Sequence, residues 1–324
     1  MADLLRITSL NVAFNGSRAV RDLDLVVAPG EALGIVGESG CGKSVTWLAA
    51  LGLLDGHARV TGSVRLEGRE LLGLPDNALA ELRGGRIAMI FQDPGSALNP
   101  VRRIGWQIEE ALALHQGLRG GAARAEALRL LDQVGIPDPA RRINLFPHEM
   151  SGGQNQRVMI AMALAGRPAL LIADEPTTAL DVTIQAQMLD LLARLQAETG
   201  MALVLISHDL GIVEEVCARV AVMYAGRIVE SGSATRVLTA PAHPYARGLL
   251  AALPPIEGAR RALVAIPGQV PHAGEERPGC AFAPRCGDAV AECRTHRPVL
   301  RALEPGHAVA CLRATAETGA GAGA

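Results

Sequence analysis

Residues 37–44 read Gly37-Glu38-Ser39-Gly40-Cys41-Gly42-Lys43-Ser44, which fits the pattern G-x-x-x-x-G-K-[ST] of a phosphate-binding loop. In such a loop a compact lysine ammonium reaches the β- and γ-phosphates as a point charge, a role that a planar guanidinium cannot fill. Lys43 is the only lysine of the 324-residue chain, since every other strongly basic side chain is an arginine. Chance survival would explain the rarity but not the position. We therefore expect ATP to be bound by Gly37, Ser39, Gly40, Cys41, Gly42, Lys43, Ser44 and Val45.

The segments around this loop predict an α/β fold. Residues 32–36 form a short apolar strand that leads into the loop, and residues 44–54 have the pattern of a helix. Strands and helices then alternate, which favours a mostly parallel sheet with helices on both faces. Rough alternation over 4–14 and 22–27 indicates an antiparallel β subdomain. A helical stretch from about 95 to 165 looks like an inserted subdomain.

Composition limits the possible functions. Hydrophobic residues make up 49% of the chain but aromatic residues only 2%, so we expect a core of Ala, Leu, Val and Ile. The net charge of −2 gives no basic bias that would indicate a nucleic-acid partner. The first residues lack a basic region followed by an apolar core, so we expect no secretory signal. Because no apolar run reaches the length of a bilayer span, any membrane role is expected to come through partners.

An apolar run that ends in two carboxylates predicts the magnesium end of the site. Leu170-Leu171-Ile172-Ala173 precedes Asp174 and Glu175. We expect Asp174 to hold Mg²⁺, with Ser44 as another ligand. Glu175 is then placed to orient or deprotonate the attacking water. By itself, an Asp-Glu pair after a strand could equally cap a helix.

Three further segments carry polar groups suited to a nucleotide site. Ser151-Gly152-Gly153-Gln154 opens a helix whose N–H groups can bind an anion. Gln92 follows a predicted strand and could contact Mg²⁺ or water. His208 ends another strand and could contact the γ-phosphate, although a histidine at such a position is more often a surface residue.

In order and spacing, these segments resemble the ATP-binding subunit of an ABC transporter over residues 4–240. In that resemblance, residues 37–44 are the Walker A loop, Gln92 marks the Q-loop and residues 151–154 are the signature. Asp174 and Glu175 end Walker B. Ala179-Leu180-Asp181 is the D-loop and His208 the switch histidine. Phe14, 29 residues before Lys43, stands where the family commonly places an aromatic that stacks on adenine; it could also be a core residue of the first strand.

The resemblance implies an ATPase with a RecA-like parallel core that works as a dimer. Two subunits would face each other head to tail, and each ATP would lie between one P-loop and the partner's signature, Ser151, Gly152, Gly153 and Gln154. It implies Lys43, Glu175 and His208 as catalytic residues, and Ser44, Gln92 and Asp174 as contacts to Mg²⁺. Because the signature keeps its serine and both glycines, we expect a hydrolysis-competent site.

The region after residue 240 narrows the resemblance. His243-Pro244-Tyr245 looks like the segment found in ATPases of oligopeptide and dipeptide importers, a group that includes nickel importers. We therefore divide the chain into an ABC ATPase domain (1–240), a loop-rich extension (241–316) and a disordered tail (317–324). The resemblance implies a subunit on the cytoplasmic side of a bacterial membrane, with two permeases, an extracytoplasmic binding protein and a second ATPase that could be a distinct or an identical chain. Residues 92–142 are the expected permease contact.

The extension also holds four of the six cysteines, Cys280, Cys286, Cys293 and Cys311. Their spacing lacks the close C-x₂-C pairs usual for zinc. They could ligate a [4Fe–4S] cluster, as in some members of the peptide-importer group, or they could be plain thiols. Zinc or disulfides are a further alternative that the spacing favours less.

The sequence leaves other functions and several cargo classes open. A DNA-acting ABC ATPase would also carry a cysteine-bound metal, but such proteins have paired nucleotide domains and longer insertions. The residues do not distinguish dipeptide, longer peptide, glutathione-like or nickel cargo.

Overall fold

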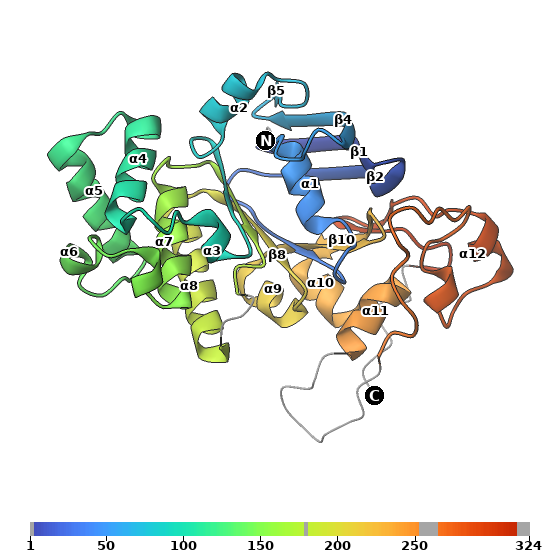
Figure 1. Cartoon of the computed structure of the whole chain (residues 1–324). Coiled ribbons are helices and arrows are strands. Elements are labelled where there is room, and N and C mark those ends of the chain that lie inside the picture. Colours follow the sequence, from blue (N-terminus) through green and yellow to red (C-terminus); the bar gives the residue numbers. More distant parts are fainter. Residues whose placement is uncertain (1–2, 178–180, 253–264, 316–324) are drawn as a thin grey trace. The chain divides into compact units, whose positions relative to one another are not determined.

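The computed structural model describes residues 3–177, 181–252 and 265–315 (Figure 1). The chain divides into two compact units that are interleaved along the sequence. Unit 1 comprises Met1–Leu4, Ala28–Glu31 and Gly73–Ile206, and unit 2 comprises Leu5–Val27, Ala32–Leu72 and Ser207–Ala324. The predicted disordered tail, together with Ala179 and Leu180 of the predicted D-loop, lies outside the described residues.

Unit 2 contains an antiparallel sheet in the order β2-β1-β4-β5. β1 (Leu5–Phe14) and β2 (Ser17–Val27) are joined at Asn15 and Gly16, which both have positive φ, as the common two-residue hairpin turn requires. β4 (Ala58–Leu66) pairs with β1, and β5 (Arg69–Glu70) with β4. The alternating sequence thus correctly predicts the two N-terminal strands, although β2 begins earlier than the pattern suggests.

A second group of strands in unit 2 has the order β11-β12-β10-β9-β3. All five residues of β3 (Ala32–Val36) are buried, and the strand pairs in parallel with β9 (Arg219–Tyr224). β10 (Arg227–Ser233) returns antiparallel to β9. Helices α1 (Lys43–Ala50), α9 (Leu210–Val216) and α10 (Ala234–Thr239) accompany these strands. The order strand, glycine-rich loop, helix is the one that the sequence predicts around residues 37–44.

The extension is more ordered than its proline-rich sequence suggests. It contains α11 (Pro244–Ala251), the 3-10 turn η2 (Ala283–Arg285) and α12 (Ala291–Thr295), drawn in orange to red in Figure 1. β11 (Arg301–Glu304) and β12 (His307–Val309) form a hairpin, and β12 pairs antiparallel with β10. These strands are too short to show a period in the sequence, so the loop-rich prediction missed them.

Unit 1 is built on the parallel strands β6 (Ile87–Ile90), β7 (Leu170–Asp174) and β8 (Ala202–Ser207). Every residue of β7 and β8 is buried, as expected for parallel strands. Figure 1 shows α4, α5 and α6 grouped beside α7 and α8. The helices of this unit are α2 (Asp76–Leu82), α3 (Pro94–Ala97), α4 (Ile104–Gln116), α5 (Gly120–Gln133), α6 (Pro139–Arg142), the 3-10 turn η1 (Pro147–Glu149), α7 (Gly152–Leu164) and α8 (Val182–Thr199).

Aliphatic side chains hold these helices together. Ile104, Ile108 and Leu112 lie one turn apart on α4 and are fully buried, as is Leu131 of α5. Burying each such side chain contributes about 1.5–3 kcal/mol. None of the helices in the described part of the chain is long and apolar enough to cross a bilayer.

Candidate nucleotide-binding site

The P-loop, residues 37–44, joins β3 to α1 with backbone conformations that only glycine adopts easily. Gly42 has a φ of 104°, and a Cβ there would lie 2.8 Å from the Ala19 carbonyl oxygen. Thr46 fixes the start of α1, because both its N–H and its hydroxyl donate to the Gly42 carbonyl oxygen, at 3.0 and 2.9 Å. Within the loop, the Cys41 N–H donates to the Glu38 carbonyl oxygen at 3.3 Å. The loop is thus set by its own backbone.

Lys43 is held over this loop. Its Nζ donates to the carbonyl oxygens of Gly37, at 2.7 Å, and Glu38, at 3.2 Å. The residue is buried although it carries a charge, and the carbonyl dipoles compensate part of its desolvation. A bound phosphate would offer the ammonium a stronger, fully charged acceptor. Burial raises the pKa of the neighbouring Cys41 thiol, in keeping with a role for its backbone and not its sulfur.

Two other predicted site residues belong to unit 2. Phe14 ends β1, where it pairs with Ser17 on β2 and with Ala58 on β4, and it is half-buried. His208 follows β8 and is exposed. Asp209, next to it, caps α9 by accepting the Gly211 N–H at 2.9 Å. The backbone around His208 is therefore fixed by a capped helix.

The predicted magnesium and base residues belong to unit 1. β6 and β7 run parallel with Ile90 opposite Ala173, so the residues after both strands emerge at the same edge. Asp174 is buried at the end of β7, and Gln92 Nε2 donates to Glu175 Oε2 at 3.2 Å. Glu175 has a φ of 46°, and its N–H donates to the Ile206 carbonyl oxygen of β8. The sequence predicts both side chains for this site, but not their hydrogen bond.

The predicted signature is the start of α7, which begins at Gly152 as the sequence indicates. Ser151 is the N-cap: its Oγ accepts the Gln154 N–H at 3.3 Å, and the Gln154 side chain accepts the Ser151 N–H at 3.2 Å. This reciprocal capping box orders the turn. Among the described residues, none lies within 4 Å of a Cβ built at Gly152, so they leave the backbone there open to a ligand. Asp181 of the predicted D-loop likewise caps α8, accepting the Ile184 N–H at 3.0 Å.

The extension contacts the P-loop directly, a feature that the sequence analysis missed. Arg285 forms a bidentate ion pair with Glu38, with Nη1 2.8 Å from Oε2 and Nη2 3.0 Å from Oε1. This pair raises the pKa of Arg285. The Tyr245 hydroxyl accepts the Glu38 N–H at 2.8 Å. The extension thus holds both the side chain and the backbone of one P-loop residue.

An aromatic cluster supports these two contacts. The rings of Tyr224, Tyr245 and Phe282 pack with centroids 4.6–5.4 Å apart, and His243 lies 5.9 Å from Phe282. His243 caps α11, because its Nδ1 accepts the Tyr245 N–H at 3.0 Å. This capping and packing give a physical role to the His243-Pro244-Tyr245 segment, which the sequence identifies only by resemblance.

Comparison with known proteins agrees with this geometry. Residues 20–178 match the ABC transporter family model, and residues 229–293 match the oligopeptide/dipeptide transporter C-terminal region. A Brucella abortus relative named as a peptide import ATP-binding protein is 51% identical over 315 residues, 96% of this chain and 95% of that one. Oligopeptide transport ATP-binding protein OppD of Salmonella typhimurium is 48% identical over 318 residues, 97% of this chain and 95% of that one. The chain belongs to the ABC transporter family, as an ATP-binding subunit of the peptide-importer group.

Solved structures confirm the predicted fold of the ABC ATPase. The dimeric ATP-binding cassette MJ0796, bound to ADP and Pi in a post-hydrolysis state, matches with a TM-score of 0.63 and 28% identity, covering 71% of this chain and 98% of that one. The cbiO1 protein of Clostridium perfringens, part of the cbiONQ transporter complex, matches with a TM-score of 0.64 and 27% identity, covering 73% and 91%. The family identification made from the motifs is therefore confirmed.

The four cysteines of the extension line one cavity of about 180 Å³. Cys293 is buried, and Cys280, Cys286 and Cys311 are half-buried. Burial raises the pKa of the Cys280 and Cys286 thiols. Among the described residues, however, no three His, Cys, Asp or Glu side chains stand in an arrangement that could hold a single metal ion. The structure thus brings the four cysteines to one cavity without forming such an ion site.

Proposed function

We propose that this ABC subunit hydrolyses ATP to drive the import of dipeptides or oligopeptides through separate membrane permeases. The match of residues 229–293 to the oligopeptide/dipeptide transporter C-terminal region carries the cargo class. The relatives named for peptide import or oligopeptide transport support it, since each aligns over nearly the whole of both chains. A nickel or other small-solute importer is the alternative within the same group.

The proposed chemistry assigns each side chain a separate task. Lys43 leaves its carbonyl acceptors for the phosphates, and Phe14 stacks on the adenine. Ser44, Asp174 and Gln92 would hold Mg²⁺, and the bound ion would neutralise developing negative charge. Glu175 accepts a proton from the attacking water, and its hydrogen bond to Gln92 Nε2 supports this role by fixing one carboxylate oxygen. His208 contacts the γ-phosphate.

We further propose that the active form is a head-to-tail pair of ATPase subunits. Ser151, Gly152, Gly153 and Gln154 of one subunit, with Asp181, would close the ATP site of the other. The open backbone at Gly152, with its ordered cap, supports this assignment. Two permeases would dock on residues 92–142 at the cytoplasmic face of a bacterial membrane, served by an extracytoplasmic binding protein. The domain limits at residues 240 and 316 belong to the same proposal.

A substitution of Glu175 tests the hydrolytic proposal. The Glu175→Gln variant keeps the shape of the side chain but cannot accept a proton, so we expect bound ATP and a turnover reduced by at least about 100-fold. Glu149→Gln, which changes a glutamate outside the proposed chemistry, is the matched control. Wild-type turnover in Glu175→Gln would remove the base assignment. Capture of peptide-transporter permeases by the tagged wild-type chain tests the transport role, and recovery of nickel-transporter permeases would favour the alternative.

A second proposal concerns the cysteine cavity. We propose that Cys280, Cys286, Cys293 and Cys311 bind a [4Fe–4S] cluster, whose four irons would each take one thiolate. Their common cavity supports a group larger than a single ion. Iron and sulfide analysis after anaerobic purification tests this, with about four irons per chain expected. Zinc in place of iron, or a metal-free chain with unchanged folding and ATPase activity, would overturn the cluster.

A further inference from the structure

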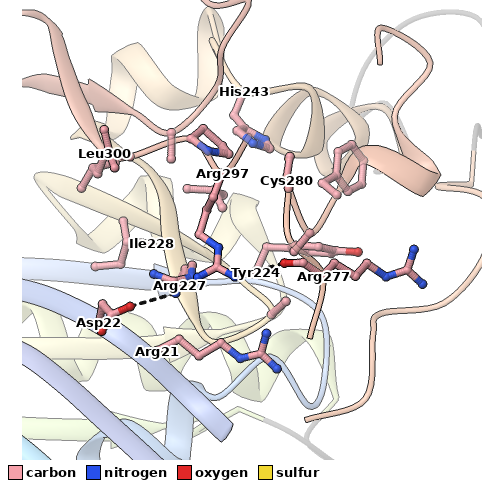
Figure 2. A pocket seen from close by; sticks show the side chains of 18 of the residues that line it. Arg21, Asp22, Tyr224, Arg227, Ile228, His243, Arg277, Cys280, Arg297 and Leu300 are labelled. Atoms are coloured by element: carbon pink, nitrogen blue, oxygen red, sulfur yellow. Dashed lines mark hydrogen bonds and ion pairs between the residues drawn. The ribbon is translucent and has the colours of Figure 1, made fainter. Parts of the chain in front are cut away.

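A second cavity in unit 2, of about 350 Å³, has no part in the proposed ATP chemistry. It lies between β2, the turn from β9 to β10, and the extension (Figure 2). Its volume is at the lower end of the range for small-molecule pockets. We call it the arginine cavity, after the four arginines in its wall, Arg21, Arg227, Arg277 and Arg297.

The charges around the arginine cavity are only partly balanced. Three carboxylates, those of Asp22, Asp24 and Glu275, also line it. Arg227 pairs with Asp22 at 2.9 Å, and Arg277 pairs with Glu275. In the part of the chain that the structure describes, Arg21 and Arg297 form hydrogen bonds to backbone carbonyl oxygens and no ion pair. The wall therefore presents two guanidinium groups without a bonded carboxylate.

Arg21 is the most informative of these groups, because it is only 6% exposed. Its Nε donates to the Arg18 carbonyl oxygen, and its Nη2 donates to those of Ala273 and Glu275. Within the described residues, Nη1 has no acceptor. A guanidinium carries five N–H donors, so the N–H groups of Arg21 that no carbonyl oxygen accepts are suited to an anion.

Arg21 lies among other charged side chains. Burial is the largest cause of its lowered pKa; Glu276 is the strongest single charge acting on Arg21 and raises the pKa, whereas repulsion from Arg18, Arg227 and Arg297 lowers it. Figure 2 shows Arg21, Arg227 and Arg297 with Asp22 in the wall of the cavity. An anion bound among these groups would relieve the repulsion and accept charge-assisted hydrogen bonds.

Part of the remaining wall is apolar. Ile228 lies on β10, while Val299 and Leu300 belong to the extension and are exposed, at 74% and 40%. Exposed aliphatic side chains at a cavity wall can bind the apolar body of a ligand. We propose that the arginine cavity binds a small organic anion, with one carboxylate or phosphate group on the arginines and an apolar body against Val299 and Leu300.

Calorimetric titration of the full chain with three probes of one length tests this site. Hexanoate and hexyl phosphate carry the two anionic groups, and hexanol is the neutral control. The protein is kept saturated with ADP and Mg²⁺, so that binding of the phosphate probe in the P-loop is suppressed. We expect at least one anionic probe to bind at least tenfold more tightly than hexanol. The tighter of the two identifies the ligand as a carboxylate or a phosphate; equal, weak binding of all three would overturn the proposal.

Variants locate the binding. Arg297→Gln and Arg21→Gln should each lower the affinity for the anionic probe about tenfold and leave the affinity for hexanol unchanged. Arg294→Gln makes the same change of charge at an exposed position of α12 outside the cavity, and should bind like the wild type. Because Arg21 also holds the backbone of the extension, Val299→Glu provides a second test that spares it: a carboxylate added at the wall should repel the anionic probe. Unchanged binding in both Arg297→Gln and Val299→Glu would refute the site.

Discussion

The ion pair between Arg285 and Glu38 makes a quantitative prediction about ATP affinity. Arg285→Met removes a bidentate contact and keeps a similar apolar stem. Hydrogen bonds to charged groups contribute about 1.5–3 kcal/mol, but the Glu38 side chain is 30% exposed and can regain water. We therefore expect the free energy that stabilises the ordered P-loop to fall by about 1–2 kcal/mol. If that cost falls on nucleotide binding, ATP affinity drops by roughly 5- to 30-fold.

A fluorescent ATP analogue titrated against the purified chain measures this change. Arg285→Lys keeps the charge without the bidentate fork, so its affinity should lie between those of the wild type and Arg285→Met. Arg247→Met is the matched control, because Arg247 pairs with Asp288 in the extension. A variant Arg285→Met that folds normally and binds ATP as the wild type does would refute the idea that the extension orders the P-loop.

Three other changes test features of unit 2. Gly42→Ala, where φ is 104°, should destabilise the chain by about 1–3 kcal/mol in a denaturant titration and abolish ATP binding; an unchanged midpoint would show that the loop tolerates a Cβ. Tyr245→Phe removes the acceptor of the Glu38 N–H and should lower the affinity for ATP several-fold. Unchanged ATP affinity in this variant would show that the Tyr245 hydroxyl does not order the P-loop. Burial, helped by Arg247, lowers the pKa of His243 to about 3, so the unfolded state binds more protons between about pH 6.5 and 3. His243 should therefore lower the free energy of unfolding by about 1.4 kcal/mol for each pH unit as the pH falls through that range. His243→Asn keeps a neutral capping side chain, so its acid titration should show a smaller slope.

Local patterns predicted the parts of the fold that depend on neighbouring residues. The P-loop between β3 and α1 could be predicted because its glycines and Lys43 form one short sequence motif. The start of α7 at Gly152 could be predicted because Ser151 and Gln154 form a capping box. Four of the five buried residues of β7, Leu170 to Ala173, were visible as an apolar run that ends at Asp174. Each of these signals comes from residues within, or next to, the element that it predicts.

The contacts between distant segments could not be predicted in this way. Arg285 and Glu38 are 247 positions apart, and no periodicity links them. Glu38 occupies a variable position of the P-loop pattern, so the pattern assigns it no task. The pairing of β12 with β10 rests on a three-residue strand, which is too short to show alternation. Such contacts depend on the completed fold. The resemblance drew attention to Tyr245 but did not predict its contact with Glu38.

The carboxylate of Glu230 shows how firmly the extension is built into its unit. It is fully buried on β10, accepts the N–H groups of Ala242 and His243 at 2.8 Å, and lies 2.8 Å from His307 Nε2. A chain cut at residue 240 would lose all three of these partners and would expose the edge of β10. Exchange of C-terminal regions between importers should therefore succeed only when Glu230 travels with the region that it anchors. The extension and the β10 strand of unit 2 would then be inherited together.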